Sequence, residues 1–222
     1  MKNTTQTRKL SSLDRLILGV DRVVRTVSKG STKADRQSPA QNIPENLATD
    51  SLSVDEKKHI GGLMRINHTG EVCAQALYQG QAITARSQSV RTAMESSAKE
   101  EEDHLAWCEQ RLTELNSRTS LLNPLFYGLS FSIGALAGVA GDKWSLGFVA
   151  ATEEQVCQHL RDHLGQLPEH DHSTRAILHQ MLDDEQHHGN QALAHGGIPF
   201  TQPAKRLMAS IAKIMTQTTY RI

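Results

Sequence analysis

The sequence predicts an all-α protein built around a four-helix bundle that holds two metal ions, and three observations support this class. The spacing Glu-x-x-His occurs at Glu101 and His104 and again at Glu185 and His188, each time in a segment with a helical pattern. A further glutamate lies about thirty residues before each motif. No alternation of apolar and polar residues is long enough for a strand. The chain therefore consists of two similar halves.

The spacing of these residues suits a shared metal centre. On a helix, residues three apart lie on one face, one turn apart, so that both side chains reach the same or adjacent cations. Carboxylates with neutral imidazoles suit iron or manganese better than a thiolate-bound structural zinc. Glu71 lies 30 residues before Glu101, and Glu153 lies 32 residues before Glu185, so these two supply the remaining carboxylates of a two-metal bundle. We expect Glu101 and Glu185 to bridge the ions and Glu71 and Glu153 to bind one ion each.

The charge of the chain is zero overall but unevenly distributed. The first 36 residues contain nine Lys or Arg and three Asp or Glu, whereas the remainder contains 15 and 21. A basic arm favours an anionic partner surface. Nucleic acid is not predicted as a partner, because aromatic residues make up only 4% and are not interleaved with basic ones. The cysteines Cys73, Cys108 and Cys157 form no C-x-x-C pair, which indicates a reducing compartment without a disulfide framework.

The N-terminal region predicts an arm. Apolar residues recur at helical spacing between Leu13 and Val27 with charges on the opposite face, which predicts an amphipathic helix with Ser12 as its N-cap. This helix either packs on the body of the protein or docks on a membrane or a partner. Residues 29–50 have no apolar period and predict a linker. We expect an arm of residues 1–50 followed by one bundle domain of residues 51–222.

Caps and breaks define the helices of this domain. Ser53 and Glu56 have the spacing of a capping box, which predicts a helix from there to about Arg86. A second helix follows at 89–117 after a short break and should be its antiparallel neighbour. Further helices are predicted at 173–195 and 203–218. The last of them either packs on the body or joins a membrane-facing surface.

Residues 119–141 form a run of 23 residues without a charge, long enough to cross a membrane. A single crossing would separate the ligands of the two halves on opposite sides of the bilayer. A break at Gly141 resolves the conflict. A short apolar helix then forms the crossover of a ferritin-like bundle, and a new helix carries Glu153 and ends near Gly165. The crossover is either part of the core or a patch that lies on a membrane.

With these residues placed, the chain from about Leu52 onwards closely resembles the demethoxyubiquinone hydroxylase family, the di-iron monooxygenases of ubiquinone biosynthesis. The segment Arg65-Ile-Asn-His-Thr-Gly-Glu71 is similar to that family's Asn-His-x-Gly-Glu signature, and Tyr78-Gln-Gly-Gln follows it. The pair Val72-Cys73 departs from the Tyr-Gly common in other members. This departure affects the surroundings of the site and leaves the ligand set complete.

The resemblance implies a di-iron centre that uses dioxygen and an external electron donor to hydroxylate the ring of a polyprenylated methoxyquinol. Because such a substrate is confined to the bilayer, we expect a peripheral protein on the cytoplasmic face of the cell membrane. A mitochondrial inner-membrane location ranks lower, since Asp14 and Asp21 are unusual in a presequence. A homo-oligomer stays open. The predicted catalytic and iron-binding residues are Glu71, Glu101, His104, Glu153, Glu185 and His188.

Four residues are candidates for positions around the ligands. Metal-bound imidazoles usually need an acceptor for the other ring nitrogen, and Asp184 and Glu100 each precede a predicted ligand glutamate. Tyr78 lies seven residues after Glu71 and either hydrogen-bonds near the site, relays an electron or packs in the core. His159 reaches the cluster only indirectly.

Three other kinds of function compete with a hydroxylase. Iron storage or ferroxidase activity in a ferritin-like protein uses similar ligands, and so do peroxide scavengers. The uncharged segment and the basic arm fit neither a soluble cage nor a rubrerythrin-type protein. A structural membrane-associated helical protein, with these Glu and His as surface charges, is a third alternative.

Overall fold

The structure, a computed structural model, describes residues 19, 21, 23–28, 30–44 and 52–222. These residues form helices and contain no strand, so the predicted all-α class is confirmed. The elements are the 3₁₀ turn η1 (Pro39–Asn42) and the helices α3 (Val54–Thr84), α4 (Gln88–Glu114), α5 (Asn123–Ala140), α6 (Asp142–Gln166), α7 (His172–Ala194) and α8 (Gln202–Thr219).

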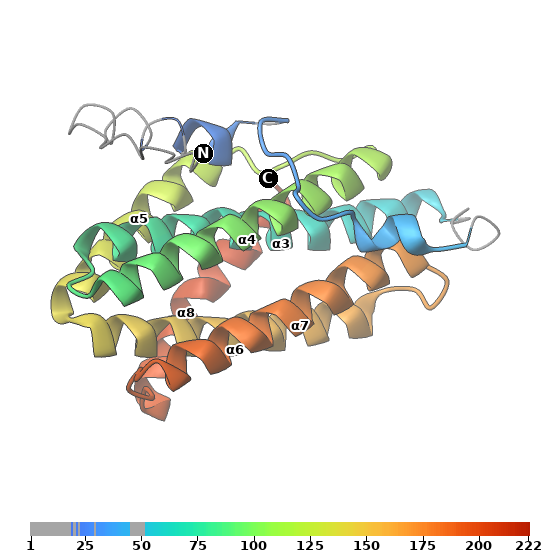
Figure 1. Cartoon of the computed structure of the whole chain (residues 1–222). Coiled ribbons are helices and arrows are strands. Elements are labelled where there is room, and N and C mark those ends of the chain that lie inside the picture. Colours follow the sequence, from blue (N-terminus) through green and yellow to red (C-terminus); the bar gives the residue numbers. More distant parts are fainter. Residues whose placement is uncertain (1–18, 20, 22, 29, 45–51) are drawn as a thin grey trace, which may run out of the picture.

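Helices α3, α4, α6 and α7 form the bundle, and α5 connects its two halves (Figure 1). The antiparallel pair α3 and α4 packs against the pair α6 and α7, with α5 lying along α3. Apolar side chains from all four bundle helices fill the core at one end; among them are Ile60, Met64, Trp107, Leu160 and Leu178. The predicted four-helix arrangement with a crossover helix is therefore present.

Side-chain hydrogen bonds fix the starts of some of the helices. Ser53 Oγ accepts the backbone N–H of Glu56, and Glu56 Oε2 accepts the N–H of Ser53 at 2.7 Å, which is the predicted capping box. Asp142, the first residue of α6, accepts the N–H groups of Arg86 and Ser87 at 2.9 and 2.8 Å. Because these two residues precede α4, this carboxylate ties the start of α6 to the start of α4. Gly141 adopts a φ of 120° and makes the predicted break between α5 and α6.

Helix α5 approaches α3 closely because glycines lie at the contact. A Cβ at Gly80 would lie 2.3 Å from the carbonyl oxygen of Phe131, and one at Gly134 would lie 2.2 Å from that of Leu77. Either methyl group would force the two helices apart. This close contact covers one side of α5.

The other side of α5 is exposed and apolar. By length and composition alone, Asn123–Ala140 is apolar enough to cross a membrane. Only 22% of this window is buried against the rest of the chain. Leu125, Leu129, Leu136 and Val139 are each more than half exposed. Helix α8 likewise exposes an apolar stripe, formed by Leu207, Ile211 and Ile214. Burial of the whole crossover in the core, one of the two alternatives, is thereby excluded.

Part of the predicted N-terminal linker packs against the bundle. The expected helix at 13–28 lies largely outside the described residues, although Val23–Val27 are helical and Val23 and Val27 pack beside the core. Residues 30–44, expected to be a linker, lie against the bundle: Ser38 is buried and Ala40 packs on the core. We call residues 30–44 the strap. The polar sequence of the strap did not predict this packing, because the strap is held mainly by hydrogen bonds and ion pairs and has no apolar pattern. The predicted domain boundary near residue 50 lies outside the described residues and stays a prediction.

A buried histidine predicts that acid weakens the fold. Nδ1 of His163 lies 2.8 Å from Oδ1 of Asn67, and burial lowers the pKa of His163 to about 4. Since this value lies below the ordinary pKa of about 6.5, the stabilising contribution is complete above that pH and is lost as the pH falls towards 4.

We expect the pH dependence of the free energy of unfolding between pH 7 and pH 5 to be smaller in His163→Gln than in the parent protein, by about 2 kcal/mol. Urea unfolding of both proteins at the two pH values measures the difference. Parallel losses of stability would show that His163 is protonated as easily in the folded chain as in the unfolded one.

Candidate metal centre

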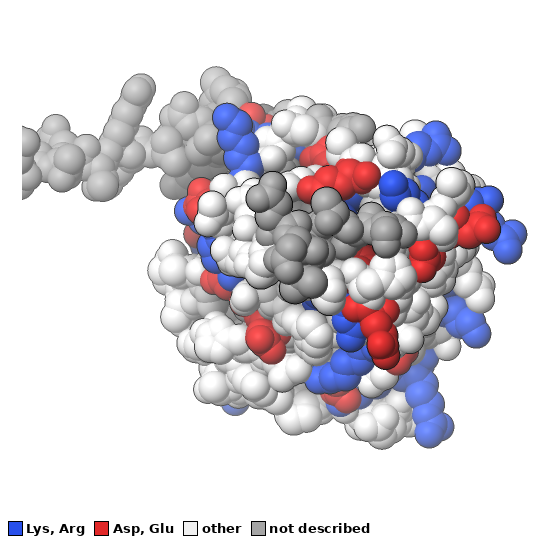
Figure 2. Space-filling view, turned by 90° about the vertical axis from the view of Figure 1, so that its right-hand side faces the viewer, with Lys and Arg blue, Asp and Glu red and all other residues white. Residues whose placement is uncertain are grey.

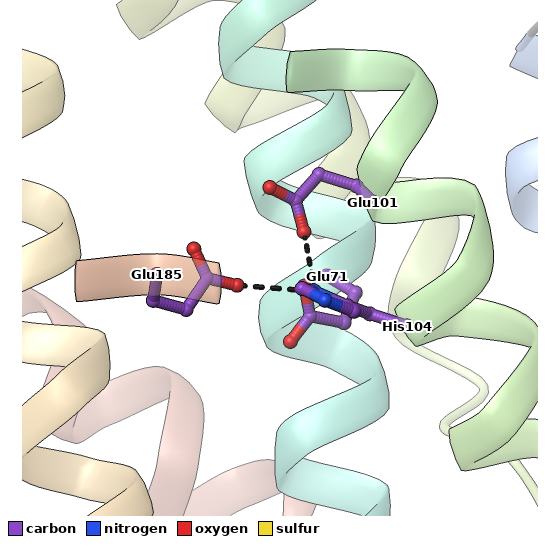
Figure 3. A group of neighbouring side chains, drawn as sticks. All are labelled: Glu71, Glu101, His104 and Glu185. Carbon is purple, nitrogen blue, oxygen red and sulfur yellow. Dashed lines mark hydrogen bonds and ion pairs between the residues drawn. The ribbon is translucent and has the colours of Figure 1, made fainter. Parts of the chain in front are cut away.

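Four of the six predicted ligands meet at one point inside the bundle. Glu71 comes from α3, Glu101 and His104 from α4, and Glu185 from α7 (Figure 3). One potential ligand atom from each lies within 4.8 Å of the others, and all four side chains are buried. Helical geometry explains the convergence, because the three-residue spacing directs Glu101 and His104 to the same side of α4.

The two central glutamates each face both histidines of the Glu-x-x-His motifs. Nδ1 of His104 lies 3.0 Å from Oε2 of Glu101 and 3.1 Å from Oε1 of Glu185. Nδ1 of His188 lies 3.3 Å from Oε1 of Glu101 and 3.2 Å from Oε2 of Glu185. Each carboxylate thus directs one oxygen to each histidine, which is the arrangement that a bridging carboxylate requires.

The two remaining predicted ligands differ in their surroundings. Glu71 Oε2 lies 3.6 Å from Nδ1 of His104. Glu153, on α6, is buried, and its Oε1 accepts a hydrogen bond of 2.5 Å from the Tyr78 hydroxyl. Tyr78 is therefore linked to the carboxylate on the opposite side of the bundle instead of to Glu71 on its own helix, a pairing that the sequence did not reveal.

The charges at this site favour cations. Burial raises the pKa of Glu71 and of Glu153, and Glu101 and Glu185 raise both further. Burial opposes ionisation of Glu101 as well, but hydrogen bonds and charge from His104 and His188 outweigh it and hold its pKa well below the ordinary value. Glu101 and Glu185 overcome the effect of burial on His188 and raise its pKa to about 12. Four carboxylates in so small a volume need positive charge among them, from protons or from metal ions.

Unpartnered oxygens test whether a metal fits. Oε2 of Glu153 is buried without a hydrogen bond. Oε1 of Glu101 and Oε1 of Glu185 also lack a hydrogen bond, although each lies within ion-pair distance of a histidine Nδ1. An unpaired buried carboxylate oxygen is costly. Metal ions between the carboxylates and the histidines would satisfy all three atoms, so the residues present fit a metal centre.

Each histidine directs its other nitrogen to a carboxylate outside this group. Nε2 of His104 lies 2.9 Å from Oδ2 of Asp184, and Nε2 of His188 lies 2.9 Å from Oε2 of Glu100. Both predicted contacts are present. Each histidine is paired with the residue that precedes the glutamate of the other motif, so the two Glu-x-x-His helices hold each other's imidazoles. A carboxylate on Nε2 leaves Nδ1 as the nitrogen available to a metal.

The structure also shows what the sequence did not. His159, considered as an indirect neighbour of the site, instead packs against His163 with ring centres 5.6 Å apart. Together with His59 it lines an open cavity of about 720 Å³. Arg36 of the strap contacts Asp184 at 2.8 Å, and no motif pointed to it.

The fold and the site define a helical-bundle protein with a buried centre of carboxylates and imidazoles that can hold metal. The model of a family described as "Ubiquinone biosynthesis protein COQ7" matches residues 58–219. The chain belongs to this family, so both the predicted family and the prediction of an enzyme are confirmed.

Close relatives cover nearly the whole chain. A protein of Azotobacter vinelandii is 61% identical over 215 residues, which make up 97% of this chain and 98% of the relative. A protein of Pseudomonas fluorescens is 58% identical over 219 residues, 99% of this chain and 100% of the relative. Both bear the name 3-demethoxyubiquinol 3-hydroxylase. These matches also include the strap, which precedes the region covered by the family model.

Proposed function

We propose that this protein is a 3-demethoxyubiquinol 3-hydroxylase that uses two iron ions and dioxygen to hydroxylate the ring of a polyprenylated quinol. One observation carries the proposal: Glu101 and Glu185 each face both His104 and His188 with different oxygens. A buried pair of carboxylates between two imidazoles suits two adjacent ions. The names of the close relatives support the reaction and the substrate.

The proposed roles of the ligands follow from their contacts. Glu101 and Glu185 would be shared by the two ions, while His104 and His188 would each bind one ion through Nδ1. Glu71, beside His104, would be a further ligand of the first ion, and Glu153 would be a further ligand of the second. When bound, two irons that are reduced by an external donor would activate dioxygen for insertion into a ring C–H bond.

Other residues of the chain control the surroundings of this chemistry. The Tyr78 hydroxyl keeps its proton, because burial and the neighbouring Glu153 raise its pKa well above the ordinary value. It therefore donates to Oε1 of Glu153 and orients that carboxylate. Complete burial of Glu101 and His104 excludes bulk water from the centre.

The proposed substrate requires contact with a bilayer. The exposed apolar side chains of α5 and of α8 provide surfaces that can enter the lipid interface. Arg206 and Lys213 lie on the same helix as the α8 stripe and can attract anionic lipid. By contrast, the end of the bundle seen in Figure 2 carries acidic and basic residues interspersed. We propose a peripheral association with the cytoplasmic face of the cell membrane.

Turnover with isotopically labelled dioxygen tests the reaction. The purified protein, loaded with ferrous ion and supplied with a chemical reductant, should convert a short-tailed 3-demethoxyubiquinol into the hydroxylated product. The new hydroxyl group should carry the label. Oxidation of ferrous ion without change in the quinol would instead support a ferroxidase or storage protein, and an unlabelled hydroxyl group would exclude dioxygen as the source of its oxygen.

Removing the metal should lower the melting temperature, because the buried carboxylates then repel one another. We expect about two irons per chain before chelation. At a metal concentration 100 to 1,000 times Kd, metal binding stabilises the folded chain by roughly 3–4 kcal/mol. This corresponds to a shift of the melting temperature on the order of 5–15 °C for a chain of this size. Thermal unfolding with and without a chelator measures the shift. A chelator should leave the melting temperature of Glu101→Ala unchanged, and an equal shift in that variant would place the metal elsewhere.

A further inference from the structure

The strap is joined to the two Glu-x-x-His helices through Arg36. Nε of Arg36 lies 2.6 Å from Oδ2 of Asp103 on α4, and Nη1 lies 2.8 Å from Oδ2 of Asp184 on α7. Asp103 directly precedes His104 in the sequence, and Asp184 directly precedes Glu185. One guanidinium therefore bridges the two helices at the level of the proposed ligands.

Several contacts hold Arg36 in place. Its guanidinium carbon lies 4.9 Å from the centre of the Trp107 ring, and its carbonyl oxygen accepts a hydrogen bond of 3.3 Å from the indole of Trp107. Oδ1 of Asp103 accepts the backbone N–H groups of Asp35 and Arg36 at 2.6 and 3.2 Å. Such contacts on both the backbone and the side chain leave the guanidinium little freedom to move.

The carboxylate of Asp184 is consequently fixed from three directions. Oδ2 receives Arg36 and lies 2.9 Å from Nε2 of His104, while Oδ1 accepts a hydrogen bond of 3.0 Å from Gln180. The corresponding partner of His188 is less constrained: the Glu100 side chain is 46% exposed, and His188 is its one hydrogen-bonding partner among the described residues. The two imidazoles are therefore held unequally.

We propose that Arg36 is a positioning residue of the metal centre, which fixes the Asp184 carboxylate so that His104 presents Nδ1 to the metal. This inference rests on the proposed function, since it requires a metal bound at His104. The strap then contributes a residue that supports the metal centre, although it precedes the region covered by the family model. A lysine would supply only a point charge and could not span both aspartates with a planar fork of donors.

The first test is the affinity for ferrous ion, measured by anaerobic titration of the full-length protein. Loss of an outer partner of a metal-bound histidine typically weakens metal binding about 10- to 100-fold, and we expect Arg36→Gln to fall in this range. Arg36→Lys should be intermediate and replaces Arg36→Gln if that variant does not fold. Lys99→Met is the matched control, because it removes an exposed ion pair between α4 and the strap, Lys99 with Asp35 at 2.8 Å, without touching Asp184.

The second test separates positioning from simple attachment of the strap. In a double-mutant cycle, Arg36→Gln should cause no further loss of affinity once Asp184→Ala is present, because Arg36 acts through that carboxylate. With cobalt(II) as a spectroscopic probe, Arg36→Gln should shift the visible absorption bands of the bound ion, and Lys99→Met should leave them unchanged.

Three results would overturn the inference. Wild-type affinity and an unchanged cobalt spectrum in Arg36→Gln would show that Asp184 needs no anchor. An equal loss of affinity with and without Asp184→Ala would make Arg36 a structural residue of the strap. Failure of the wild-type chain to bind ferrous ion would refute the proposed metal centre, and this inference with it, so the two failures are distinguishable.

Discussion

Replacing Glu101 or Glu185 by alanine should remove bound iron and reduce hydroxylation by more than the roughly 100-fold that loss of an outer partner can cost. Each carboxylate directs one oxygen to His104 and the other to His188, so a single truncation takes a ligand from both ions. Iron content of the purified variants and turnover of a short-tailed quinol measure the two effects.

Glu154→Ala is the matched control for these variants. Glu154 follows a proposed ligand directly on α6, but its side chain is 60% exposed and pairs with Lys205 on α8. Exposed pairs of this kind contribute about 1 kcal/mol or less. We expect nearly full iron content and activity in Glu154→Ala, and comparable losses in the control and in Glu101→Ala would mean that the ligand face of the bundle is wrongly assigned.

Replacing Leu129 and Leu136 together by aspartate should release the protein from lipid vesicles and greatly reduce turnover of a long-tailed quinol. These leucines are 54% and 70% exposed on α5, so charge there opposes entry into the lipid interface without disturbing the core. Phe131 is unsuitable for this test, because it is partly buried beside Tyr127 at a ring distance of 6.4 Å. Iron content and turnover of a short-tailed quinol should stay close to those of the parent protein.

Vesicle sedimentation measures the release, and added charge by itself needs a control. Thr92→Asp with Ser96→Asp introduces the same charge at exposed positions of α4 and should leave binding to vesicles intact. High salt should weaken attachment only in part, since the apolar contribution is not screened. Loss of iron in the α5 variant would mean that the segment supports the fold, and unchanged vesicle binding would move the contact to α8 or to the N-terminal arm.

The sequence by itself determined the helices and the residues that face the centre. Helical periodicity is local: a spacing of three residues places Glu101 beside His104, and Glu185 beside His188, whatever the helices pack against. The capping box at Ser53 and the break at Gly141 are equally local, and the structure contains both. The signature that ends at Glu71 is also local, since it lies within the single helix α3 and can be read from consecutive residues.

Only the tertiary structure decided which groups meet across helices. The contacts of His104 with Asp184 and of His188 with Glu100 join the two helices, so they depend on the rotation and separation of α4 and α7. The contact of Tyr78 with Glu153 depends in the same way on α3 and α6.

The strap and α5 show the same limit. An uncharged helix has one composition whether it is buried or exposed, so packing alone showed that α5 leaves one apolar side exposed. Arg36 was equally hidden, because a polar segment without apolar periodicity carries no sign of the two aspartates to which it binds. Periodicity within one helix records which way a side chain points, whereas distances between helices arise only when the whole chain packs.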